Sequence, residues 1–107
     1  MAATVNGRRL ADDVMGLRAA FQDQIKARSD SAAWRLVDAL FAQPVVNADY
    51  VAATLAVSDR GARNAIAVLE RAGVLQPSTS ARRHRVWQAP QVLVAMDAFA
   101  ARAGRRA

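Results

Sequence analysis

Residues 47–73 constrain the fold more than any other stretch, because they predict two short helices joined by a tight turn. Asn47 is typical of a helix N-cap, and Asp49 places a carboxylate in the first turn, where the helix dipole favours it. The apolar face of this first helix is formed by Val51, Ala52 and Leu55. Ala56, Val57 and Ser58 then make the turn, with Val57 as the apolar plug between the helices.

The second helix of the pair is predicted over residues 58–72 and has two distinct faces. Ser58 suits its N-cap, Asp59 suits its positive end, and Gly73 suits a left-handed C-cap. The stripe expected to be buried contains Ala62, Ala65, Ile66 and Leu69. The outward stripe contains Arg60, Arg63, Asn64, Ala67 and Arg71. The outward face is therefore cationic and carries an amide.

This arrangement is typical of a helix-turn-helix whose second helix is presented to an anionic partner. Two amphipathic helices with a glycine stop also occur in all-α proteins that bind no nucleic acid. The charge distribution favours the first interpretation. The chain of 107 residues has a formal net charge of +6, and residues 58–88 alone contribute +4, from six bases and two acids. Such a local excess is typical of a surface that binds a phosphate backbone.

The N-terminal region predicts a long amphipathic helix from about Arg8 to Lys26, after frayed residues 1–7. Its apolar stripe consists of Leu10, Val14, Leu17, Phe21 and Ile25. A stripe of this kind must be covered by something. Packing within its own domain is the simpler interpretation, and dimerisation through the stripe is the alternative.

A second helix is predicted over residues 31–42, capped by Asp30 or Ser31. Its wide apolar face contains Trp34, Val37, Leu40 and Phe41, with Trp34 as the largest core residue expected. Gln43 and Pro44 end this helix, and Val45-Val46 is compatible with a very short strand.

The segment after Gly73 predicts a β-hairpin with a basic tip. Residues 74–76 and 84–88 are its expected strands, and residues 77–80 have the composition of a turn. The basic residues of the tip are Arg82, Arg83 and Arg85. A hairpin that directly follows a recognition helix forms a wing, and these side chains suit phosphate or minor-groove contacts. The alternative is a loop that only contributes solubility.

The last predicted helix begins near Pro90, and its apolar stripe contains Val92, Leu93, Met96, Phe99 and Ala100. The expected fold is mostly α with a small β-hairpin, a winged helix-turn-helix with an extra helix at each end. Its expected parts are an N-terminal amphipathic helix (1–30), the winged helix-turn-helix (31–88), and a C-terminal helix with a basic tail (89–107).

Residues from about Arg28 to Pro90 resemble the C-terminal winged-helix domain of Fic-family proteins. The motifs that carry the resemblance are residues 36–41, 43–46, 55–58, 65–66, 69, 72–75 and 82–87. The last of these is a basic run followed by Val86 and Trp87. The resemblance implies a winged-helix fold with a nucleic-acid-binding or regulatory role, and covers about three-fifths of the chain.

The catalytic part of that family is absent from this sequence. Fic adenylyltransferases carry a His-Pro-Phe motif and a Gly-Asn-Gly-Arg loop, whereas the one histidine here, His84, precedes an arginine. Asp12 and Asp13 are adjacent, so they point to different sides of a helix and cannot act as an acid–base pair. We therefore predict no enzymatic activity and no cofactor.

Other function classes are also disfavoured by composition. The chain has no cysteine and one histidine, so we predict neither a disulfide framework nor a metal site. It has no apolar run of about 18 residues and no secretory signal pattern, so we predict no membrane partner and a cytoplasmic location.

The sequence thus predicts a bacterial-type transcription regulator that binds double-stranded DNA. Arg60, Arg63 and Asn64 are the candidates for base edges, because arginine matches guanine and asparagine matches adenine. Phosphate contacts are assigned to Ser58, Arg71, Arg82, Arg83 and Arg85. Proteins of this class commonly bind as homodimers on paired half-sites. In this chain the terminal helices are the expected dimer contact.

The alternative is a regulatory protein-interaction module, related to the accessory domain of Fic-family proteins, that binds no DNA. In this interpretation the terminal stripes dock a partner protein and the basic face is incidental. Gly61 and Ala67 favour it slightly, because they leave fewer side chains for base contacts on the recognition helix than proteins with high sequence specificity have.

Overall fold

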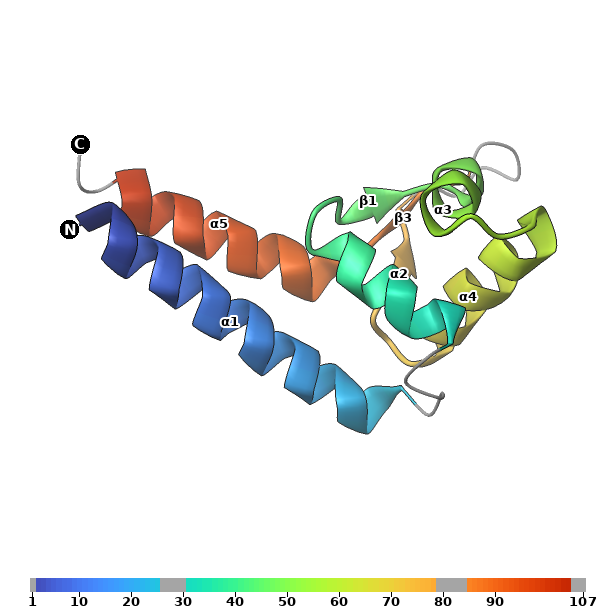
Figure 1. Ribbon diagram of the computed structural model, residues 1–107, viewed down its shortest axis with the longest axis horizontal. Helices are drawn as coiled ribbons and strands as arrows, with labels where there is room; N and C mark the ends of the chain where they lie inside the picture. Colours follow the sequence, from blue (N-terminus) through green and yellow to red (C-terminus); the bar gives the residue numbers. More distant parts are fainter. Residues whose placement is uncertain (1, 26–30, 79–84, 105–107) are drawn as a thin grey trace.

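The computed structural model describes residues 2–25, 31–78 and 85–104, and the side chains of residues 12–25, 31–78 and 85–101. Its elements, in chain order, are α1 (Ala2–Gln24), α2 (Ala32–Leu40), β1 (Val45–Val46), α3 (Ala48–Leu55), α4 (Asp59–Arg71), β2 (Gln76–Pro77), β3 (Trp87–Gln88) and α5 (Pro90–Gly104) (Figure 1). The chain is mostly helical with a small antiparallel sheet, as predicted.

Two boundaries differ from the prediction. Helix α1 begins at Ala2 rather than near Arg8, so residues 2–7 are helical and not frayed. The hairpin strands β2 and β3 have two residues each. Val74 and Leu75 lie outside β2, because their backbone N–H groups donate to the Leu69 carbonyl oxygen at the end of α4.

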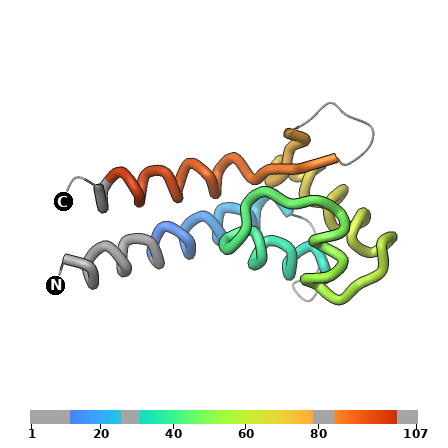
Figure 2. Tube along the Cα trace, turned by 90° about the horizontal axis from the view of Figure 1, so that it is seen from above, coloured from blue at the N-terminus to red at the C-terminus, as the bar shows by residue number. Residues whose placement is uncertain are grey.

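The elements divide into two regions that differ in shape. Helices α2, α3 and α4 pack on one another beside the sheet and form the body, while α1 and α5 lie side by side and antiparallel as an arm (Figures 1 and 2). The molecule is elongated as a result, with extents of 45 × 30 × 23 Å.

The sheet joins segments that are far apart in the sequence. Its strand order is β1-β3-β2, and both pairs are antiparallel. In the register of the sheet, Trp87 of the central strand faces Val46 on one side and Pro77 on the other. The hairpin of β2 and β3 is thereby tied to the start of α3, a connection that the sequence does not predict.

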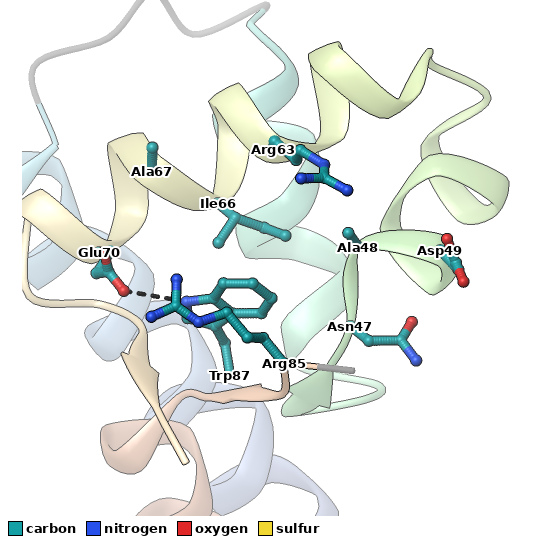
Figure 3. Close-up of a pocket in the computed structure, with 9 residues that line it drawn as sticks. All are labelled: Asn47, Ala48, Asp49, Arg63, Ile66, Ala67, Glu70, Arg85 and Trp87. Atoms are coloured by element: carbon teal, nitrogen blue, oxygen red, sulfur yellow. Dashed lines mark hydrogen bonds between the residues drawn. The ribbon is translucent and has the colours of Figure 1, made fainter. Parts of the chain in front are cut away.

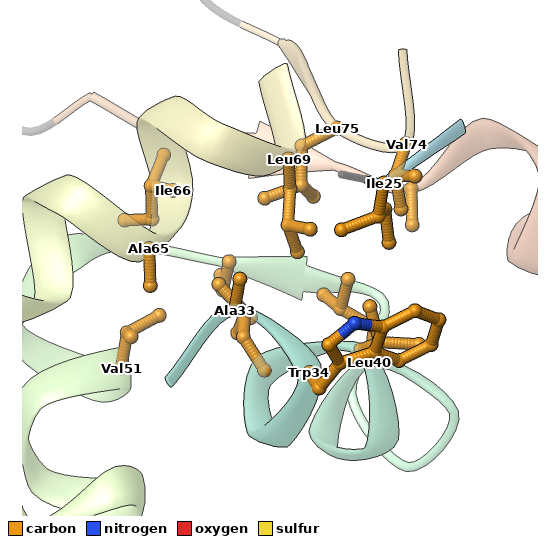
Figure 4. Packing of buried hydrophobic residues seen from close by; sticks show 14 of the residues in the cluster. Ile25, Ala33, Trp34, Leu40, Val51, Ala65, Ile66, Leu69, Val74 and Leu75 are labelled. Carbon is orange, nitrogen blue, oxygen red and sulfur yellow. The ribbon is translucent and has the colours of Figure 1, made fainter. Parts of the chain in front are cut away.

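The core lies mainly between α2, α4 and the segment after α4. Helix α2 buries Trp34, Val37 and Leu40 as predicted, and it also buries Ala33 and Leu36, because α2 has neighbours on several sides. Figure 4 shows side chains from α2 and α4 in one cluster with Val74, Leu75 and Ile25. The four residues of the predicted α4 stripe are all buried, which confirms that prediction.

The C-terminal end of α1 docks onto α2 within the same chain. Phe21 is fully buried and its ring lies 6.5 Å from that of Phe41, between centroids. Arg18 donates a hydrogen bond of 2.9 Å to Asp38 and lies over the Trp34 ring, 5.1 Å from its centroid. The hydrogen bond and the charge of Asp38 raise the pKa of Arg18 above its ordinary value.

This docking determines what covers part of the stripe that the sequence offers for dimerisation. Phe21 and Ile25 are covered inside the single chain, so the intramolecular alternative accounts for both, and neither offers surface to a second copy. Val14 and Leu17 are half-buried. The side chain of Leu10 lies outside the described residues.

The outer part of the arm is covered less well. On α5, Val92 is buried and Leu93 and Phe99 are half-buried, but Met96 is 39% exposed. Val94 on α5 and Met15 on α1 are 67% and 70% exposed. Each arm helix has the other as its main neighbour, and a single neighbour covers only one side of a helix.

Candidate nucleic-acid interface

Local chemistry sets the position of α4, as the sequence predicts. The hydroxyl of Ser58, at the N-cap, accepts a hydrogen bond of 3.0 Å from the backbone N–H of Gly61. A Cβ atom on Gly61 would lie 3.3 Å from both Ser58 Oγ and Val57 Cβ, so this glycine permits the close turn. Gly73 ends the helix with a φ of 84°, which confirms the predicted left-handed residue.

Helix α3 is capped at both ends. The Asn47 side chain accepts a hydrogen bond of 2.7 Å from the backbone N–H of Tyr50, confirming the predicted N-cap. At the other end, Ala56 adopts a left-handed φ of 55° and Arg35 of α2 donates to the Leu55 carbonyl oxygen. Val57 is half-buried against the core, as expected for the plug.

The predicted outward face of α4 is exposed. Arg60, Arg63, Asn64 and Arg71 are all exposed, and Ala67 is half-buried. Within the part of the chain that the structure describes, none of the three arginines makes an ion pair or a side-chain hydrogen bond. Their guanidinium groups are therefore available to an external anion.

The hairpin approaches α4 from the side of its C-terminal half. Trp87 of β3 donates a hydrogen bond of 3.0 Å from Nε1 to Oε1 of Glu70, which joins the central strand to α4. Arg85 precedes β3 and is exposed. The described residues do not include Arg82, Arg83 or His84. Of the arginines in the predicted basic tip, they include Arg85.

Between α3, α4 and β3 lies a pocket of about 390 Å³. Figure 3 shows its lining, which comes from the first turn of α3, one edge of α4 and the start of β3. The structure thus brings Arg63 and Arg85 to one pocket, although the sequence assigns them to separate contacts. Glu70 and Trp87 also line the pocket, although no local sequence pattern assigns either of them a role at a site.

Other kinds of site are not found among the described residues. In these segments no three His, Cys, Asp or Glu side chains are grouped closely enough to hold a metal ion. None of the described helices has the length and apolarity needed to cross a membrane. Comparison with known proteins finds no family model and no curated sequence that matches the chain.

Proposed function

We propose that the chain is a DNA-binding winged helix-turn-helix protein that acts as a transcription regulator. One observation carries this proposal: the exposed face of α4 presents Arg60, Arg63 and Asn64, and the hairpin presents Arg85 beside the same helix. Arginine and asparagine are the side chains that read guanine and adenine in the major groove. In this proposal α4 enters the major groove and the hairpin is the wing on the flanking backbone.

The positions of the remaining residues support phosphate contacts. Ser58 and Arg71 lie at opposite ends of α4, where the strands that flank a major groove would run. The Ser58 hydroxyl oxygen accepts from Gly61, so its own proton remains available to a phosphate oxygen. Arg85, with Arg82 and Arg83 in the sequence before it, adds charge on the wing side.

The first test is binding of a labelled random-sequence duplex, followed by fluorescence anisotropy at about 50 and 200 mM salt. Each neutralised phosphate contributes a slope of about −0.9 to the dependence of log K on log salt. We expect a steep loss of affinity between the two salt concentrations. Absence of binding at the lower concentration would remove the DNA proposal.

Variants then locate the contact. Arg63→Ala should weaken specific binding by about 1–3 kcal/mol and relax preference at one base position. Equal weakening on every sequence would leave Arg63 only a phosphate contact. Arg102→Gln, which removes the same charge from the last turns of α5, is the matched control and should leave affinity nearly unchanged.

A second candidate is a protein-interaction module, and the exposed arm residues Met15, Val94 and Met96 favour it. An apolar docking surface predicts association that is insensitive to salt, because it releases no counterions. Salt dependence of the measured binding therefore separates the two candidates.

A further inference from the structure

The pocket between α3, α4 and β3 has one apolar side built from three elements. Ile66 is buried at its base, and Ala48, Ala67 and Trp87 are half-buried around it. The hydrogen bond from Trp87 Nε1 to Glu70 keeps the indole ring in one orientation. A flat apolar wall with a fixed aromatic ring is suited to a planar ring of a ligand.

The charged side chains of the pocket are two cations and two anions. Arg63 and Arg85 make no ion pair among the described residues, and in Figure 3 they stand between Asp49 and Glu70, which lie at opposite ends. Glu70 is already engaged by Trp87, and Asp49 lies in the first turn of α3. The two guanidinium groups therefore line the pocket without a partner among the described residues, and a guanidinium binds carboxylates in a bidentate manner.

We propose that this pocket binds a small planar aromatic carboxylate, with its ring against Trp87 and Ile66 and its carboxylate on Arg63 and Arg85. The volume of about 390 Å³ is near the lower end of the range of about 300–1,000 Å³ for ligand pockets, which suits one or two fused rings. An anion without a ring would leave the apolar wall unused. A neutral ring would leave both arginines without a partner.

The pocket shares its two arginines with the surface assigned to DNA. A bound carboxylate would occupy the guanidinium groups of Arg63 and Arg85 and offset one of their two positive charges, so the ligand and DNA would compete for the same side chains. This antagonism rests on the proposed function, whereas ligand binding itself does not.

The direct test is isothermal titration calorimetry of the full chain with 1-naphthoate, in the absence of DNA. We expect saturable binding at one molecule per chain. 1-Naphthamide, which keeps the rings without the charge, and inorganic phosphate, which keeps a charge without the rings, should each bind at least about tenfold more weakly. No saturable binding of 1-naphthoate would overturn the proposal, as would tighter binding of a 5′-mononucleotide.

Variants tie the binding to the pocket. Arg85→Gln removes a predicted carboxylate partner and should weaken 1-naphthoate about tenfold. Ala67→Leu fills part of the pocket without changing a charge and should weaken it to a similar degree. Arg102→Gln on α5 should have no effect. Binding that both pocket variants leave unchanged would overturn the proposal, because non-specific attraction to a basic protein would explain it.

Competition then tests the antagonism separately. At low salt, 1-naphthoate should release labelled DNA from the wild-type chain, whereas 1-naphthamide at the same concentration should release far less of it. If the chain binds no DNA, the proposed function fails while the calorimetry still decides on the pocket. If DNA and 1-naphthoate bind together, the ligand site stands and the antagonism is rejected.

Discussion

The body and the arm have similar apolar stripes in the sequence, but the fold buries these stripes to different extents. The stripe of α4 is buried completely, because α2 and α3 both pack against it. The stripe of α5 is buried at Val92 and is 39% exposed at Met96, because α1 is its main neighbour. A periodic stripe therefore predicts a helix, but the number of neighbours decides how much of the stripe is removed from water.

The largest expected effect comes from truncating a leucine to alanine in the body, compared with the same substitution in the arm. Leu69→Ala, at a fully buried position of α4, should lower the free energy of unfolding by about 2–5 kcal/mol. Leu93→Ala, at a half-buried position of α5, should cost about 1 kcal/mol. Urea unfolding of both variants measures the difference. Equal losses would mean that the arm is packed as tightly as the body.

The next comparison concerns helix starts. Ser58→Ala removes the bond that caps α4 and should destabilise the chain by about 1 kcal/mol. Ser31 occupies the N-cap of α2, where the chain arrives from the arm, but makes no cap bond, and its hydroxyl is buried without a partner among the described residues. Ser31→Ala should therefore be neutral or slightly stabilising, and thermal unfolding of both variants measures the difference. The opposite order of the two variants would contradict this assignment of caps.

A pair of opposite substitutions should stabilise both regions. Ala56 of the body has a left-handed φ of 55°, which costs an L-residue roughly 1–2 kcal/mol, so Ala56→Gly should gain about 0.5 kcal/mol after its entropic cost. Gly16 lies within α1 with open space where a Cβ atom would be added, so Gly16→Ala should gain about 0.5–1 kcal/mol. Differential scanning calorimetry of each variant checks the signs. A loss for Ala56→Gly would show that the turn does not retain its conformation in solution.

The smallest expected effect is at the exposed arm residues. Met15→Gln and Val94→Gln should change the free energy of unfolding by less than about 0.5 kcal/mol, because both side chains already face water. Urea unfolding at two protein concentrations makes the measurement. A clear loss that grows with protein concentration would show that a second copy covers the arm, and would restore dimerisation as the role of these helices.

Features that depend on residues close together in the sequence are predicted better than features that depend on distant segments. The sequence predicts the caps at Asn47 and Ser58, the turn at Val57 and the glycine at Gly73, because each depends on neighbours within a few residues. Ser31 is the local exception, since it occupies the predicted N-cap of α2 but makes no cap bond. The start of α1 at Ala2 was not predicted, since no capping residue marks it.

The candidate site was predicted only in part for the same reason. The outward face of α4 follows from helical periodicity alone, and Arg60, Arg63 and Asn64 are exposed as expected. The bond from Trp87 to Glu70 and the pairing of β3 with β1 depend on contacts between distant segments, which no local pattern encodes. The pocket that joins Arg63 to Arg85 could therefore be found only in the structure.

The arrangement of the arm also has a mechanical consequence. The start of α1 and the end of α5 lie together at the far end of the arm (Figure 1). A force applied between these ends would act across the two helices and load their contacts one after another from the tip, as in unzipping. Because only the contacts at the opening end bear the force at any moment, the two helices of the arm would separate before α3 and α4 were pulled apart. Opening of the arm would therefore leave the arrangement of α3 and α4 unchanged.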